Sequence, residues 1–150
     1  MYEFLDYQTR DVMTADPVTI GPDASLAELE DLFDKNGFNG VPVLSNAGEL
    51  LGVVTKLDLL KAFRFTDEHM FPPYAEIMAR SVASVMSRDL RSVCPRTPLT
   101  RVLEKMVDSG CKSFPVLDAD RPAGMIAREH VMRGLARAAS GERARSAHAR

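Results

Sequence analysis

Apolar side chains recur every three to four residues in two stretches of the chain, which predicts two helices with one apolar face each. The first stripe lies in 26–33 and follows Ser25, whose hydroxyl can cap a helix start. The second stripe lies in 99–107 and follows a Thr-Pro pair, in which the threonine can cap and the proline suits the first helical position. A glycine follows each stripe, Gly37 or Gly110, and can end the helix.

Short apolar runs predict strands around these helices. Each helix is followed by two strands with a turn between them, at 41–44 with 50–54 and at 113–117 with 123–127. Each helix is also preceded by a short strand, at 18–20 or 91–93, and each strand pair is followed by a closing helix, at 56–64 or 128–139. The order β-α-β-β-α therefore occurs twice, which indicates the α+β class.

The two halves of the chain are copies of one unit. At an offset of 73 residues (85 − 12), Val12-Met13-Thr14 aligns with Val85-Met86-Ser87, and the Val-Pro-Val-Leu run at 41–44 aligns with Phe-Pro-Val-Leu at 114–117. We assign the first copy to 9–64 and the second to 82–137, with a lead-in at 1–8, a connector at 65–81 and a tail at 138–150. Since three strands are marginal alone, the copies should pack sheet to sheet as a pseudo-twofold pair.

The composition is that of a globular protein with a substantial core. The chain has 150 residues, of which 45% are apolar and 27% charged. It contains no apolar run near ~20 residues, so we expect no membrane span. Its start lacks the pattern of a signal peptide, which favours a cytoplasmic protein with two reduced cysteines, Cys94 and Cys111.

The net charge of −2 conceals an uneven distribution. Residues 137–150 carry four arginines and one glutamate (+3), which leaves −5 on residues 1–136. An acidic body argues against general nucleic-acid binding, because such binding depends on neutralising phosphates. The basic tail has no apolar face, so we expect it to be disordered.

The junction Thr55-Lys56-Leu57-Asp58 carries the strongest candidate chemistry. It follows a buried strand, and Thr55 with Asp58 can form a capping box for the next helix. The same junction gathers N–H donors, the positive end of a helix dipole and a carboxylate, which can hold a sugar diol and a phosphate. The motif alone leaves both interpretations open.

The repeat, the Val-Met-Thr start, the Gly-Val-Pro-Val strand and the Gly-Val-Val-Thr-x-x-Asp-Leu end together resemble the CBS (cystathionine β-synthase) domain family. The chain is similar to a tandem CBS pair, or Bateman module. The resemblance implies a regulatory module that binds an adenosyl ligand (AMP, ADP, ATP or S-adenosylmethionine) in a cleft with two related sites. It also implies pairing of two such modules as a homodimer, and an effector protein that the sequence does not name.

By position, the resemblance implies that Thr55 and Asp58 hold the ribose. Lys56 and Lys112 are the nearest cations for a phosphate, which needs charge-assisted donors. The adenine would lie against five residues of copy two: Ser87, Arg91, Val93, Ser113 and Phe114.

Copy two departs from this pattern, because Ala127 and His130 stand where copy one has Thr55 and Asp58. Alanine has no hydrogen-bonding side chain, and histidine is a poorer acceptor for a diol than a carboxylate. His130 could contact a phosphate if protonated, or be an ordinary residue of a first helical turn. We therefore expect at most one good nucleotide site per chain. Five other residues would line the second site: Thr14, Pro17, Val18, Asn39 and Val41.

Two hypotheses about function follow. The first is a sensing module that binds an adenine nucleotide in one cleft and signals to a partner protein. The second is a dimerisation or scaffold module with vestigial nucleotide sites. Catalysis and a resident cofactor are not expected, since the chain has no Gly-rich phosphate loop and neither cysteine has an evident histidine partner. A metal site is not expected either, because the cysteines and His69, His130 and His148 lack ligand spacing.

Overall fold

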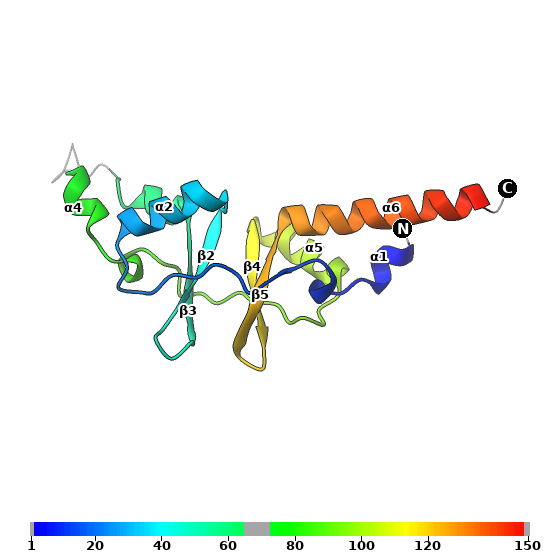
Figure 1. Cartoon of the computed structure of the whole chain (residues 1–150), viewed down its shortest axis with the longest axis horizontal. Coiled ribbons are helices and arrows are strands. Elements are labelled where there is room, and N and C mark those ends of the chain that lie inside the picture. The colour runs from blue at the N-terminus through cyan, green and yellow to red at the C-terminus, as the bar shows by residue number, and fades with distance from the viewer. Residues whose placement is uncertain (1, 65–72, 149–150) are drawn as a thin grey trace. The chain divides into compact units, whose positions relative to one another are not determined.

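The computed structural model describes residues 2–64 and 73–148 and has the predicted α+β architecture (Figure 1). His69, and Phe71-Pro72 in the predicted connector, lie outside the described residues. The elements follow in the order α1 (Tyr2–Asp6), η1 (Thr9–Asp11), β1 (Thr14–Ala15), α2 (Leu26–Asn36), β2 (Gly40–Leu44), β3 (Leu50–Thr55), α3 (Lys56–Lys61), α4 (Tyr74–Met78), η2 (Val82–Ser84), α5 (Leu99–Ser109), β4 (Ser113–Asp118), β5 (Arg121–Ala127) and α6 (Arg128–His148).

The chain forms two compact units. One unit is Pro17–Leu90, and the other combines Met1–Asp16 with Arg91–Arg150. In the first unit β2 pairs antiparallel with β3, and in the second the sheet order is β1-β5-β4. The predicted strands at 18–20 and 91–93 are reduced to single parallel bridges, Ile20 with Val43 and Val93 with Val116.

Each unit includes the segment that starts the other copy of the repeat. The unit Pro17–Leu90 contains Val85-Met86-Ser87, and the other unit contains Val12-Met13-Thr14. Ser87 exchanges two main-chain hydrogen bonds with Val53 of β3, at 2.9 and 3.0 Å. In the other unit β1 pairs with β5, so that Thr14 lies opposite Met125. The compact units therefore divide the chain after Asp16 and Leu90, because these long-range pairings join segments that are distant in sequence.

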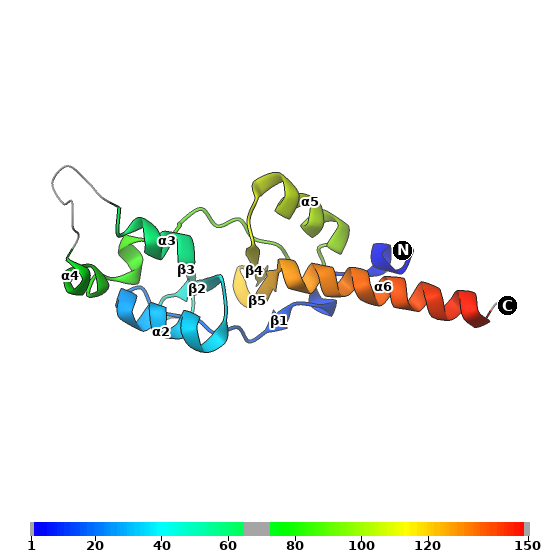
Figure 2. The same ribbon diagram turned by 90° about the horizontal axis from the view of Figure 1, so that it is seen from above.

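The two predicted amphipathic helices are confirmed and supply much of each core. In α2, Leu26, Leu29 and Phe33 are buried, the Ser25 hydroxyl accepts a hydrogen bond from the Glu28 amide at 3.2 Å, and Gly37 ends the helix at φ 66°. In α5 the buried residues are Leu99, Val102 and Met106. They pack with side chains of the strands and of α6, which begins beside β5 (Figure 2), including Phe114, Val116, Ile126 and Val131.

Two details of α5 differ from the prediction. The Thr97 hydroxyl accepts a hydrogen bond from the Cys94 amide at 2.9 Å instead of capping the helix, so Pro98 occupies the N-cap position. Val107, which we placed on the apolar stripe, has 73% of its surface exposed. The buried stripe of α5 therefore ends at Met106, in the turn before the C-cap residue Gly110.

Helix α6 runs to His148, beyond its predicted end at residue 139 and through most of the segment predicted to be disordered (Figure 1). The segment is rich in alanine and arginine, which favour helix, and extending an existing helix costs far less than starting one. Ala138 is fully buried in the same core cluster as Phe4 of α1. Within the part of the chain that the structure describes, no helix combines the length and the apolarity needed to cross a membrane.

Two glycines permit the long-range strand pairings. A Cβ atom at Gly52 would overlap the carbonyl oxygen of Ser87, and one at Gly124 would overlap the carbonyl oxygen of Thr14. In both cases the obstacle is main chain, which cannot move away without breaking the ladder. The absence of a side chain at these positions is therefore a requirement of the fold.

Gly52→Ala and Gly124→Ala should each lower the free energy of unfolding by about 1–3 kcal/mol, the usual cost of overpacking. Gly21→Ala is the matched control, since a Cβ there meets no atom within 4 Å. Urea denaturation of the three variants would measure these costs. Equal stability of Gly52→Ala and Gly21→Ala would contradict the close packing described for β3.

Candidate functional site

The junction between β3 and α3 forms the predicted capping box. Thr55 is the last residue of β3 and the N-cap of α3, and its hydroxyl accepts a hydrogen bond from the Asp58 amide at 3.1 Å. In return, Oδ2 of Asp58 accepts hydrogen bonds from the amide and the hydroxyl of Thr55, both at 2.9 Å. Capping therefore occupies one carboxylate oxygen of a half-buried aspartate.

The second carboxylate oxygen of Asp58, Oδ1, accepts no hydrogen bond from any residue that the structure describes. It thus remains available as a charged acceptor at the start of a helix. A cis-diol needs such an acceptor, because its two hydroxyl groups donate. One junction can accordingly cap its helix and bind a ligand.

Of the residues predicted for this first site, Ser87 belongs to the same unit as Thr55 and Asp58. Its main chain pairs with Val53, two positions before Thr55. The other predicted adenine contacts, Arg91, Val93, Ser113 and Phe114, belong to the other unit, so their part in this site stays a prediction. Val93 and Phe114 are buried in the core of that unit.

The two cations predicted to bind phosphate, Lys56 and Lys112, lie in different units of the chain. The Lys56 amine lies 6.0 Å from the centre of the Phe33 ring, a cation–π distance that directs it onto α2. Lys112 lies in the unit that does not contain Asp58, and its main-chain oxygen accepts a hydrogen bond from the Arg128 amide at 3.0 Å. Its role as a phosphate partner likewise remains a prediction.

The equivalent junction in copy two uses the His130 ring where copy one uses Asp58. Nδ1 of His130 accepts a hydrogen bond from the Ala127 amide at 2.9 Å, so the ring takes over the capping role of the carboxylate. Nε2 lies 3.1 Å from the hydroxyl of Thr14. Since Nδ1 is an acceptor, a neutral ring carries its proton on Nε2 and donates it to Thr14.

The surroundings of His130 favour this neutral form. Burial lowers the pKa of the ring and is the largest cause; Glu129 opposes the shift and Arg133 adds to it. Thr14 occupies the repeat position of Ser87 (14 + 73), so the contact forms between equivalent points of the two copies. The other residues predicted for the second site, Pro17, Val18, Asn39 and Val41, belong to the other unit.

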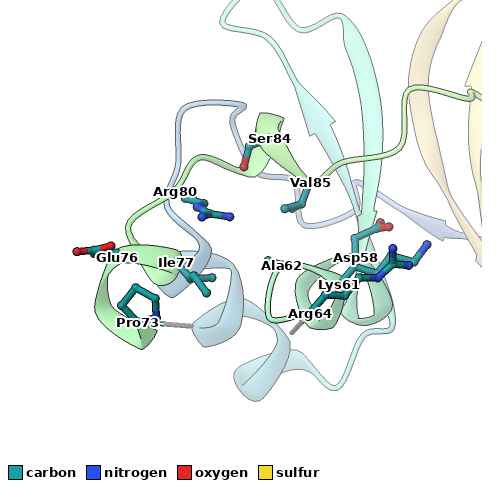
Figure 3. Close-up of a pocket in the computed structure, with 10 residues that line it drawn as sticks. All are labelled: Asp58, Lys61, Ala62, Arg64, Pro73, Glu76, Ile77, Arg80, Ser84 and Val85. Atoms are coloured by element: carbon teal, nitrogen blue, oxygen red, sulfur yellow. The ribbon is translucent and has the colours of Figure 1, made fainter. Parts of the chain in front are cut away.

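A pocket of about 490 Å³ opens beside Asp58, in the unit Pro17–Leu90 (Figure 3). This volume falls in the range of small-molecule sites. Its apolar wall includes Ala62, Ile77 and Val85, and its cations are Lys61, Arg64 and Arg80. Sequence reasoning missed these cations, although Lys61 and Arg64 follow Asp58 at steps of three residues, the spacing of one helix face.

The structure describes no metal centre and no nucleophile with a histidine partner. Among the described residues, no group of three or more histidine, cysteine or acidic side chains could hold a metal ion. Cys94 and Cys111 are free, and the described hydrogen bonds of His130 go to Ala127 and Thr14.

Comparison with known proteins supports the repeat and the fold. The family model of the CBS domain matches residues 10–64 and 82–137. The L-aspartate semialdehyde sulfurtransferase of Methanosarcina acetivorans is 30% identical over 129 residues, which are 85% of this chain and 24% of that protein. The chain thus spans about a quarter of the length of the curated relatives it matches.

Solved structures that share the fold include two complexes with adenosyl ligands. CBSX2 in complex with AMP has a TM-score of 0.74 at 23% identity, covering 87% of this chain and 97% of that one. The CBS domain pair of MJ0100, in complex with 5′-methylthioadenosine and S-adenosyl-L-methionine, has a TM-score of 0.71 at 23% identity, covering 85% and 94%. Because the family model matches both copies of the repeat and the fold is that of a CBS domain pair, the chain belongs to the CBS domain family, as a CBS domain pair.

Proposed function

We propose that the chain is a regulatory module that binds an adenosyl nucleotide at the Thr55–Asp58 junction and passes the change to a partner protein. The observation that carries the proposal is the carboxylate of Asp58, which keeps one oxygen unbonded among the described residues at the start of α3. Support comes from two proteins of the same fold, since CBSX2 binds AMP and the MJ0100 pair binds S-adenosyl-L-methionine.

The chemistry of the junction suits a ribose. The hydroxyl groups of the sugar would donate to Oδ1 of Asp58, in hydrogen bonds strengthened by the negative charge. The capping box fixes the rotamer of Asp58 through two hydrogen bonds to Oδ2, so little further ordering is needed on binding. Ser87, paired beside β3, would line the same site.

We propose that the second junction is not a nucleotide site. Both ring nitrogens of His130 already have partners, Ala127 and Thr14, so the ring offers no acceptor to a diol. A ligand would have to displace the Thr14 contact and would gain only an uncharged partner. One nucleotide per chain is therefore the expected stoichiometry.

A dimerisation or scaffold module with vestigial sites is the alternative, and one observation favours it. Among the described residues, six large apolar side chains on helices are mostly exposed: Leu5, Leu57, Leu60, Tyr74, Val107 and Met132. Such side chains are typical of surfaces that pair with another protein, and a homodimer would cover them. Ligand binding at Asp58 separates the two functions, because a scaffold does not require it.

We propose that the chain is not itself an enzyme. The sulfurtransferase activity belongs to a relative of which this chain matches only 24%. The described residues present a binding junction and two free thiols, and neither thiol is hydrogen-bonded to a histidine. Ligand binding is the chemistry that this arrangement supports.

Replacing Asp58 by asparagine should weaken the binding of AMP, ADP, ATP or S-adenosylmethionine, whichever stabilises the wild type, by about tenfold to a hundredfold. The physical reason is the loss of a charged acceptor for the ribose, since hydrogen bonds to charged groups contribute about 1.5–3 kcal/mol. Thermal unfolding with and without each ligand measures this, because specific binding raises the apparent stability.

Glu28→Gln is the matched control, since it removes the same charge from the equivalent position of α2, which Ser25 caps. Its response to each ligand should equal that of the wild type. Equal responses of the wild type and Asp58→Asn to every ligand would reject nucleotide binding at Asp58 and leave the scaffold function.

The stability of the protein should fall as the pH drops through about 6.5, in part because of His130. The folded state lowers the pKa of His130 below 6.5, chiefly through burial, so the unfolded state binds the proton more readily. The contribution of His130 is complete above pH 6.5 and is lost as the pH falls through its folded pKa. The slope is at most about 1.4 kcal/mol per pH unit, reduced by solvent screening at this half-buried ring.

Urea denaturation of the wild type and His130→Asn between pH 5 and pH 8 isolates this effect, because all other groups cancel in the difference. Asparagine can still accept from the Ala127 amide, so the variant keeps a cap and loses the titration. The two stability curves should converge as the pH falls. Curves that stay parallel would show that His130 titrates equally in the folded and unfolded states.

A further inference from the structure

We propose that Lys61 and Arg64, with Arg80 across the pocket, form the anion-binding part of the Asp58 site. The preferred ligand is then a nucleoside polyphosphate rather than a sulfonium compound such as S-adenosylmethionine. This inference rests on the proposed function, because it names the class of ligand bound at the same site. Its evidence is separate and comes from the pocket.

The cations and the proposed ribose acceptor line one pocket within one compact unit. Figure 3 shows the side chains of Lys61 and Arg64 extending in the same direction as that of Asp58. Arg80 extends into the pocket from the opposite wall (Figure 3). A ligand whose ribose is bound by Asp58 would therefore meet Lys61 and Arg64 on the same side, and Arg80 lines the far side of the same pocket.

These three cations have no acidic partner among the residues that the structure describes. Two carboxylates also line the pocket: Asp58, whose Oδ1 is the proposed ribose acceptor, and Glu76, which points away from the cavity in Figure 3. The described lining of the pocket therefore holds three cations and two carboxylates, and like charges as near in sequence as Lys61 and Arg64 favour a bound polyanion. Arginine suits this role because its guanidinium can bind a phosphate with two parallel hydrogen bonds.

The second copy of the repeat offers an internal comparison. Arg133 stands at the position of Lys61 (61 + 72), but Ala136 replaces Arg64 (64 + 72). Outside the two copies, the same kind of offset places Tyr7 at the position of Arg80 (80 − 73). Copy two thus keeps one cation of the three, Arg133, and has His130 in place of Asp58. The complete cation cluster and the carboxylate occur together in the copy with the ligand-competent junction.

The two lysines predicted from the sequence to bind phosphate do not line this pocket. Lys56 lies over the ring of Phe33 and does not line the pocket, and Lys112 belongs to the other unit. We assign the anion-binding role to Lys61 and Arg64 because they line the pocket with Asp58, and the role of the two lysines stays a prediction. Their positive charge favours ligands with several phosphates and opposes S-adenosylmethionine, whose sulfonium is positive.

Calorimetric titration of the full chain with adenosine, AMP, ATP and S-adenosylmethionine tests this inference. The wild type should bind ATP at least tenfold more tightly than adenosine, and S-adenosylmethionine more weakly than ATP. Lys61→Gln/Arg64→Gln should remove most of the difference between ATP and adenosine and leave the affinity for adenosine within about twofold. That affinity is preserved because Thr55 and Asp58 are unchanged.

Arg101→Gln/Lys105→Gln is the matched control, since it removes two charges from exposed positions of α5 that do not line the pocket. It should keep the wild-type ratio between ATP and adenosine. If Lys61→Gln/Arg64→Gln keeps that ratio, or if the wild type binds S-adenosylmethionine as tightly as ATP, the anion-binding role is wrong while nucleotide binding at Asp58 stands. If the wild type binds none of the four, both are wrong.

Discussion

The close main-chain approach at Gly52 and Gly124 is the constraint on which the rest of the structure depends. At each glycine the last strand of one copy of the repeat pairs with the segment that starts the other copy. This pairing brings Ser87 beside the strand that leads to Thr55, and Thr14 beside the strand that leads to His130. A side chain at either glycine would push the paired segments apart and disturb the junction of that unit. Stability and site formation therefore share one requirement.

The two junctions show how one backbone arrangement can carry different chemistry. In both, the third residue after the strand caps the next helix by accepting a hydrogen bond from the last strand residue. Asp58 does so with one oxygen and keeps a second, charged acceptor for a ligand. His130 does so with one nitrogen and uses the other to hold Thr14. In the proposed function, the first arrangement leaves an acceptor for a ligand, and the second turns the same position into a hydrogen-bonded contact within the fold.

Much of the fold follows from local patterns in the sequence. The spacing of leucines and the glycine stops predicted α2 and α5, and the internal repeat predicted two strand pairs of the same kind. The capping box at Thr55 was predictable because it involves residues three positions apart. The contact between His130 and Thr14 was not, since it joins residues 116 positions apart. The extent of α6 was missed because its burial against α1 depends on tertiary packing that composition does not reveal.

The central claim is that the chain binds one adenosyl nucleotide, at Asp58 and not at His130. Amide chemical shifts recorded by NMR during a titration with ATP test it most directly, because both junctions report in one experiment. The account predicts that the amides of Thr55, Asp58 and Ser87 shift and saturate at one equivalent, while those of Thr14, Ala127 and His130 move far less. Equal shifts at the two junctions, saturating at two equivalents, would contradict it.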